Sequence, residues 1–206
     1  MSIEIRKVPT QKRAKETFDR ILSIALDLII KDGMNSLTTR KIAEAGNIPV
    51  GTVYRYFPNK KAILTQLYEK NTGSLREIVN TELVNENHEK DFKDRFYHLV
   101  KRTLDRHREQ LPFAALEYVH VVFPETLDLK MDHRKKYNHT LSLLMLQHYP
   151  HIPLEKLFEY ASFLQHVGSA ALTYISHLDE GYEDAFMRMT REGLNAIITD
   201  MEAEPL

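Results

Sequence analysis

The segment 37–61 has room for only two short helices, and it limits the fold more than any other part of the sequence. Thr38 is a good N-terminal cap for the first of these helices. After a tight turn, the second begins at Pro49, where a helix needs no backbone N–H, and it ends before Pro58. Both helices are amphipathic. The pattern therefore predicts a compact helix-turn-helix unit.

The remaining segments also follow helical spacing, and no two-residue alternation bounded by turn signals indicates a strand. A first helix is expected over 11–31, followed by Gly33 at a typical stop position. Asn59 is expected to cap a fourth helix that runs towards Leu83. Proline and glycine separate five further helices, at about 91–110, 113–123, 125–148, 153–177 and 181–202. We therefore predict an all-α protein of about nine helices.

Charge divides the chain into two parts. Residues 1–72 hold 13 Lys and Arg against 7 Asp and Glu, a net charge of +6. Residues 73–206 hold 15 against 22, a net charge of −7, and also contain all 10 histidines. A basic part joined to an acidic part is typical of a protein that presents one end to a polyanion. We predict a domain boundary near residue 72, within the fourth helix.

Composition excludes several classes of protein. The chain has no cysteine, so disulfides, thiolate metal sites and cysteine nucleophiles are excluded. The first residues lack the apolar run of a signal peptide, and no apolar segment approaches the ~18 residues that span a bilayer. A cytoplasmic location is therefore expected. The chain also lacks a nucleophile elbow, a phosphate-binding loop or a paired-carboxylate motif, so we do not expect an enzyme.

The second helix of the predicted pair has the features of a DNA recognition helix. Such a helix enters the major groove with its N-terminal residues, which must be small or point outwards. Val50, Gly51 and Thr52 satisfy this requirement. Gly51 allows close approach of the backbone, and the methyl groups of Val50 and Thr52 can contact thymine.

Polar residues that flank the tip of this helix suit the phosphate backbone of DNA. Tyr54 and Tyr56 can donate phenolic hydrogen bonds to phosphates. Thr39 and Arg40 lie at the positive end of the preceding helix, and Arg40 can alternatively reach a guanine edge. Lys60 combines its charge with the start of the fourth helix. The expected partner is double-stranded DNA.

At these positions the sequence resembles the DNA-binding domain of the TetR family of bacterial transcriptional regulators. The resemblance covers about residues 14–67 and is carried by the stretches 37–43, 51–57 and 59–61. It implies that the residues that usually contact DNA correspond to Thr39, Arg40, Val50, Gly51, Thr52, Tyr54, Tyr56 and Lys60.

Two positions depart from the family pattern. Asn47 stands where the family commonly has a turn glycine, but asparagine tolerates a left-handed conformation better than most residues. Pro49 replaces a frequent serine that caps the recognition helix and often contacts phosphate. We therefore expect the turn to form and that phosphate contact to be absent.

The resemblance implies a twofold dimer that binds a palindromic operator with two recognition helices. The last two predicted helices support a homodimer, because their apolar bands are wide enough to be buried on two sides. Small residues within these bands would let helices approach closely. The expected interface residues are Leu157, Ala161, Leu164, Gly168, Ala171, Phe186, Gly193, Leu194 and Ile197.

The resemblance also implies a small-molecule pocket in residues 73–206, whose ligand would move the two recognition helices out of register with the operator. Composition favours a hydrophobic or aromatic effector. The candidate lining residues are Phe96, Thr103, Phe113, His120, Tyr137 and His166. No cofactor is expected.

The leading hypothesis is a ligand-responsive repressor released by a small-molecule inducer. A DNA-binding activator is an alternative, because nothing in the chain records where its operator lies. A metal-sensing regulator is a further alternative, since neutral histidines bind metals well. However, only His148 and His151 approach a local chelating pair, and no metal site is assigned.

Overall fold

The computed structural model describes residues 9–84, 91–109, 119–175 and 180–203, which form two compact units. Among these residues, the first unit comprises 9–71 and 119–127, and the second comprises the remainder. The division falls inside a helix, between Asn71 and Thr72. The described residues are helical or irregular and contain no strand, which confirms the predicted all-α class.

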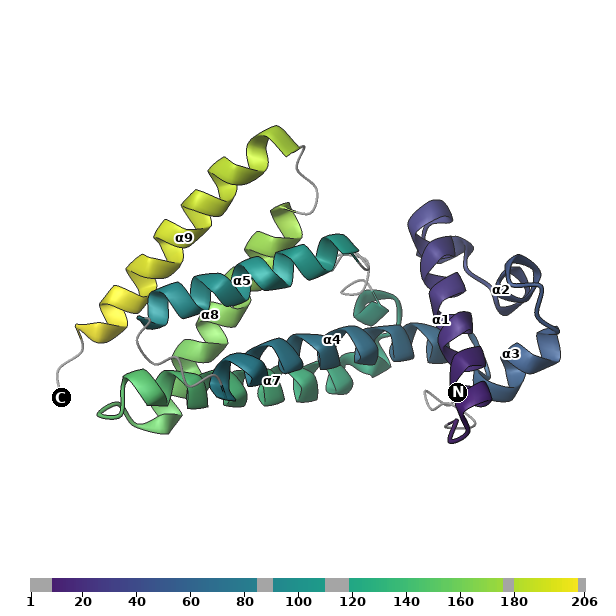
Figure 1. Ribbon diagram of the computed structural model, residues 1–206, viewed down its shortest axis with the longest axis horizontal. Coiled ribbons are helices and arrows are strands. Elements are labelled where there is room, and N and C mark those ends of the chain that lie inside the picture. The colour runs from purple at the N-terminus through teal and green to yellow at the C-terminus, as the bar shows by residue number, and fades with distance from the viewer. Residues whose placement is uncertain (1–8, 85–90, 110–118, 176–179, 204–206) are drawn as a thin grey trace. The chain divides into compact units, whose positions relative to one another are not determined.

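The first unit contains the predicted helix-turn-helix (Figure 1). Its elements are α1 (Lys12–Asp32), the 3-10 turn η1 (Met34–Ser36), α2 (Thr39–Ala45), α3 (Val50–Tyr56), the start of α4 (Lys60–Val84) and the 3-10 turn η2 (Pro124–Thr126). Gly33 ends α1 with a φ of 79°, which glycine adopts without steric cost. The oxygen of Thr38 accepts a hydrogen bond from the Lys41 amide at 3.1 Å, and the Asn59 oxygen accepts one from the Ala62 amide at 2.9 Å. Both predicted caps are therefore present.

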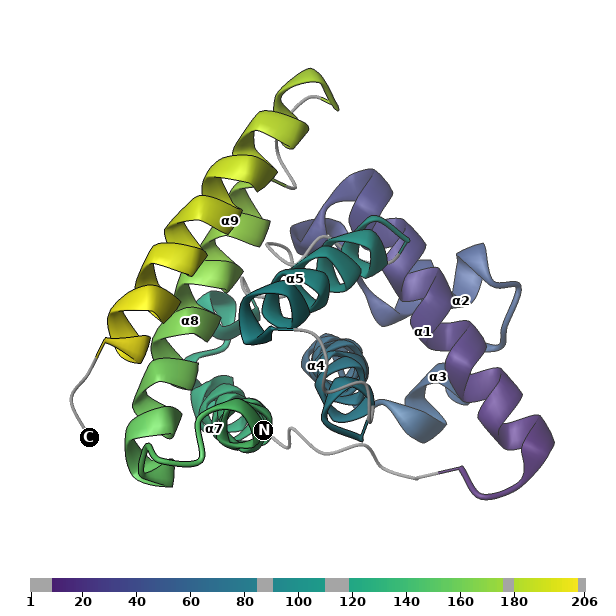
Figure 2. The same cartoon turned by 60° about the vertical axis from the view of Figure 1, so that its left-hand side comes forward.

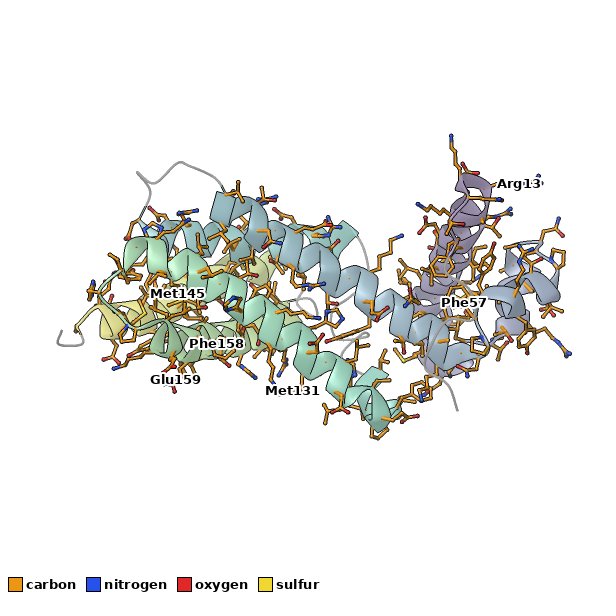
Figure 3. All side chains as sticks on the ribbon, turned by 90° about the horizontal axis from the view of Figure 1, so that it is seen from below. Arg13, Phe57, Met131, Met145, Phe158 and Glu159 are labelled. Atoms are coloured by element: carbon orange, nitrogen blue, oxygen red, sulfur yellow. The ribbon has the colours of Figure 1, made fainter. Side chains whose placement is uncertain are left out.

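Aromatic rings hold α3 and the start of α4 against α1. Phe57, which is labelled in Figure 3, is fully buried. It stacks on Phe18 of α1, with ring centroids 4.8 Å apart. Tyr56 contacts the same Phe18 ring edge-on at 5.7 Å. Because these rings lie at the end of α3, they fix the helix while leaving its first turn outside the core.

The second unit is a helical bundle. It contains the part of α4 after Asn71, together with α5 (Phe92–Glu109), α7 (Leu127–His148, from residue 128), α8 (Leu154–Ile175) and α9 (Glu180–Glu202). Figure 1 shows α7 beside α4, and two hydrogen bonds join these helices: Thr72 to His133 at 3.3 Å and Gln147 to the Leu83 carbonyl at 3.0 Å. Helices α8 and α9 pack side by side (Figure 2).

The helix boundaries follow the proline and glycine signals closely, whereas the predicted helix 113–123 lies largely outside the described residues. The predicted helix 125–148 begins with a separate 3-10 turn at Pro124 before α7. None of the described helices has the length and apolar character that crossing a membrane requires.

Candidate nucleic-acid interface

Helix α3 has a buried face and an exposed face, and the exposed one carries three of the predicted DNA-contacting residues, Val50, Gly51 and Tyr54. Val53 and Tyr56 are buried, whereas Val50 is 44% exposed and Tyr54 is 41% exposed. Gly51 is also exposed, and a side chain added there would meet no atom within 4 Å. The first turn of α3 therefore has the open, narrow surface that a major groove can accept.

Tyr54 is held at this surface by α2. The Thr39 hydroxyl donates a hydrogen bond to the Tyr54 phenol oxygen at 3.0 Å, and Thr39 itself is buried. The structure thus gives Thr39 a positioning role within the protein, which spacing alone did not reveal. Arg40, the next residue, is exposed beside it.

Tyr56 differs from the expectation that it contacts phosphate. Its side chain is 2% exposed, and its phenol oxygen accepts a hydrogen bond from Arg55 at 3.2 Å. The Arg55 guanidinium lies 4.9 Å from the Tyr56 ring centroid, a cation–π distance. Arg55 itself is exposed and belongs to the same face as Tyr54, so it is a candidate DNA contact that sequence reasoning missed. Sequence reasoning could have identified Arg55 because it is a cation at an outward position of the recognition helix.

The turn between α2 and α3 is built around two adjacent residues. Asn47 has a φ of 47°, the left-handed conformation expected for it. Gly46 precedes it, and a β-carbon there would lie 2.6 Å from the Ile24 side chain. Arg20 of α1 donates a hydrogen bond to the Gly46 carbonyl at 2.7 Å. The turn is therefore fixed to α1, which sets the angle between α2 and α3.

Pro49 caps α3 without a side-chain hydrogen bond, as its substitution for serine implies. At the other end of the interface, Lys60 is half-buried, and its ammonium group donates to the Met34 carbonyl at 3.2 Å. Lys60 is therefore tied to the protein surface beside the N-terminus of α4. Its charge adds to the positive end of that helix.

Segment 119–127 forms a second support for the first unit. Lys61 of α4 is buried and pairs with the Glu125 carboxylate. His120 packs edge-on against Tyr68 at 4.4 Å and bonds the Thr126 hydroxyl at 2.8 Å. The hydrogen bond from Lys61 is the largest effect that lowers the pKa of Glu125 below its usual value.

Four of the six predicted ligand-lining residues are described in the second unit: Phe96, Thr103, Tyr137 and His166. Phe113 lies outside the described residues, and His120 belongs to the first unit. His166 is exposed on α8, where its ring nitrogens face the Ser162 carbonyl at 2.6 Å and Arg134 at 2.9 Å.

Phe96, Thr103 and Tyr137 lie in the second unit. Phe96 is a core residue, and the Thr103 hydroxyl donates back to the Leu99 carbonyl of its own helix at 2.8 Å. Burial raises the pKa of Tyr137 to about 12, so its phenol is neutral at physiological pH. Met145 is fully buried whereas Met131, on the same helix, is exposed (Figure 3).

Most of the predicted interface residues face the interior of their own unit. Those that are buried within it are Leu157, Ala161, Leu164, Gly168 and Leu194. Ala171, Phe186 and Ile197 are partly buried, and Gly193 is exposed. A different set of apolar residues lies outwards on the same two helices: Phe163, Ala170 and Tyr174 on α8, with Ala185, Met189 and Ala196 on α9.

The described residues contain no group of three or more histidine, aspartate or glutamate side chains placed to hold a metal ion. Two of the histidines are engaged in other contacts. His133 bonds Thr72, and His148 lies 3.0 Å from Arg95. The metal-sensing alternative therefore gains no support from this part of the chain.

The described residues therefore combine a helix-turn-helix, in which the first turn of α3 is exposed, with a second unit that is helical. The family described as "Bacterial regulatory proteins, tetR family" matches residues 21–67. The chain is similar to an uncharacterized helix-turn-helix transcriptional regulator, YvkB, of Bacillus subtilis, with 35% identity over 72 residues. This match covers 34% of the chain and 38% of YvkB, so the chain matches less than two thirds of the length of this relative.

Solved structures share the whole fold. A TetR-family transcriptional regulator from Streptomyces coelicolor aligns with a TM-score of 0.66 and 19% identity, over 88% of this chain and 97% of that one. The multidrug binding protein EbrR, complexed with imidazole, aligns with a TM-score of 0.65 and 16% identity, over 93% and 97%. Residues 21–67 thus match the model of the TetR family of bacterial regulatory proteins, and the described residues share the fold of solved TetR-family regulators. This is a family of regulators rather than enzymes.

Proposed function

We propose that the protein is a ligand-responsive transcriptional repressor that binds a palindromic DNA operator as a homodimer. The observation that carries this proposal is the first turn of α3, which is exposed and free of large side chains on a rigid three-helix support. In this reading Val50, Gly51 and Thr52 face base edges, while Arg40, Tyr54, Arg55 and Lys60 contact the backbone. Because its partner is DNA, the protein acts in the cytoplasm.

The outer faces of α8 and α9 supply the dimer contact in this proposal. Phe163, Ala170 and Tyr174 follow helical spacing on α8, and Met189 is 63% exposed on α9. Gly193 lies on the same side, and a side chain there would meet no atom within 4 Å. An exposed apolar stripe beside an exposed glycine suits close packing against the same two helices of a second copy.

An effector bound in the second unit releases DNA in this proposal. EbrR, which has the same fold, is described as a multidrug binding protein, and this supports a small organic effector here. The buried apolar residues of α5, α7 and α8 favour an effector with a hydrophobic or aromatic part. An activator role is distinguished from repression by where the operator lies relative to the promoter.

The first test is a fluorescence-anisotropy titration with the duplex DNA that flanks the protein's own gene, at several salt concentrations. Tight, sequence-dependent binding that weakens with salt supports the proposal. Replacing Lys60 with alanine should weaken binding on every sequence and lower the salt slope by about one unit. Lys101→Ala is the control, because Lys101 is an exposed cation on α5 of the second unit. An unchanged slope for Lys60→Ala would remove Lys60 from the interface.

A further inference from the structure

Two arginines of the second unit have buried nitrogens without acceptors. The Nε atoms of Arg76 on α4 and Arg106 on α5 are both buried and have no hydrogen-bond partner. Arg106 donates through Nη2 to the Ser74 hydroxyl, a neutral group. The charge of Arg76 is close enough to lower the pKa of Asp132, but that carboxylate is bonded to Lys136 at 2.5 Å. Within the described part of the chain, neither guanidinium is hydrogen-bonded to a carboxylate.

Other arginines of the same unit are satisfied. Arg95 is almost fully buried and donates to the Glu82 carbonyl, while its Nη1 lies 3.0 Å from His148. Arg102 pairs with the Glu82 carboxylate at 2.9 Å. Arg76 and Arg106 are only half-buried, but a buried N–H without an acceptor still costs free energy. Unlike Arg95 and Arg102, Arg76 and Arg106 therefore each have a guanidinium N–H that could donate to a ligand.

Two buried amide oxygens lack donors in the same unit. The side-chain oxygens of Asn138 on α7 and Gln165 on α8 have no hydrogen-bond partner, and Asn138 is 3% exposed. Gly168 lies one turn beyond Gln165 and is buried, yet a side chain added there would meet no atom within 4 Å. There is therefore space beside the α8 residue that carries one of these acceptors.

Contacts between the helices place these four residues at one level of the bundle. Thr72, one turn before Arg76, bonds His133 of α7 at 3.3 Å. Arg134, one turn before Asn138, lies 2.9 Å from His166, the neighbour of Gln165. The Arg106–Ser74 bond joins α5 to the same stretch of α4. Four helices thus contribute two cationic donors and two neutral acceptors at this level, which we call the polar level of the second unit.

We propose that the polar level binds the carboxylate of an amphipathic organic acid, with Arg76 and Arg106 as its anion-binding residues. This inference rests on the proposed function, because it names the chemical class of the effector. Guanidinium groups suit a carboxylate through charge-assisted hydrogen bonds. The oxygens of Asn138 and Gln165 accept hydrogen bonds from hydroxyl or amide groups of the same ligand. Its apolar part lies against nearby core residues of the same helices, such as Leu104, Leu141 and Leu164.

The test uses the full-length protein and matched pairs of probes: phenylacetate with phenylacetamide, 1-naphthoate with 1-naphthamide, and octanoate with octanamide. Binding is measured by calorimetry and thermal shift in the absence of DNA. We expect at least one acid to bind and its neutral amide to bind about tenfold more weakly or worse. In Arg76→Met and Arg106→Met, acid binding should fall by a similar factor, whereas the exposed Lys101→Met on α5 should leave it unchanged.

The ligand-free melting temperature separates this role from a structural one. If the guanidinium groups bind an anion, Arg106→Met without ligand should melt at or above the temperature of the parent protein, because a buried N–H without an acceptor is removed. No binding of any of the acids, equal binding of acids and amides, or unchanged acid binding in both arginine variants would overturn the proposal. DNA titrations test the proposed function independently of the anion site. If the protein binds acids but no duplex DNA, the proposed function is contradicted and the anion site is supported.

Discussion

At the scale of single residues, Gly51 distinguishes a requirement of DNA binding from a requirement of folding. A β-carbon at this position would meet no atom within 4 Å, and alanine forms helices better than glycine. The free energy of unfolding of Gly51→Ala should therefore be higher than that of the parent protein by about 0.5–1 kcal/mol. DNA affinity should fall about tenfold, because the added methyl prevents close approach of the backbone to the groove. Chemical denaturation and anisotropy titrations measure the two effects separately. A variant that is more stable and binds DNA unchanged would remove Gly51 from the interface.

A second residue-scale prediction concerns Glu125 and pH. Its pKa is lowered mainly by the hydrogen bond from Lys61, so the pair stabilises the fold above the ordinary pKa of 4.5. This stabilisation is lost as the pH falls through the lowered pKa of the folded state. Glu125→Gln should therefore melt below the parent protein at pH 7, and the difference should shrink as acid is added. A difference that is constant from pH 7 to about pH 3 would contradict the linkage.

At the scale of elements, the α2–α3 turn should respond differently to substitution at its two central residues. Gly46→Ala places a methyl 2.6 Å from the Ile24 side chain and should destabilise the protein by about 1–3 kcal/mol. Asn47→Gly keeps the left-handed backbone available and should stay within about 1 kcal/mol of the parent protein. Urea denaturation of the two variants is the measurement. Equal losses of stability at the two positions would show that the space available for a side chain does not determine the stability of this turn.

Sequence patterns anticipated the elements well, because their signals are local. Proline at 49 and 58, the cap at Asn59 and the tolerance of Asn47 for positive φ act within a few residues, and each feature is present in the structure. The roles of Thr39 and Tyr56 were not predictable in this way. Thr39 meets Tyr54 across two helices, and Tyr56 is buried by Phe18 of α1, so both outcomes depend on tertiary packing.

The same limit applies to the last two helices. Their wide apolar bands predicted burial on two sides, but helical periodicity does not say which side faces the protein's own core. The structure places Leu157 and Leu164 inwards and Phe163 outwards. No sequence pattern distinguishes Arg76 and Arg106 from the other arginines, so their unpaired Nε atoms could not be predicted.

At the scale of the whole molecule, the outer face of α8 and α9 should determine oligomeric state. Met189→Glu puts a charge at the centre of the proposed apolar contact and should convert a dimer into a monomer at micromolar concentration, since a buried unpaired carboxylate is costly. Sedimentation velocity measures the change. Asp184→Asn is the control, because Asp184 is exposed on the same helix but lies off the stripe formed by Ala185, Met189 and Ala196. A parent protein that is monomeric at this concentration, or a Met189→Glu variant that stays dimeric, would contradict this interface.

The central claim is that the exposed first turn of α3 recognises duplex DNA. Selection from a random duplex library with the full-length protein, in low salt, tests this claim most directly because it needs no knowledge of the regulated genes. The account predicts enrichment of one sequence with two related halves, spaced by at least about one helical turn of DNA, ~34–36 Å. Recovery of a library indistinguishable from the starting pool would contradict it.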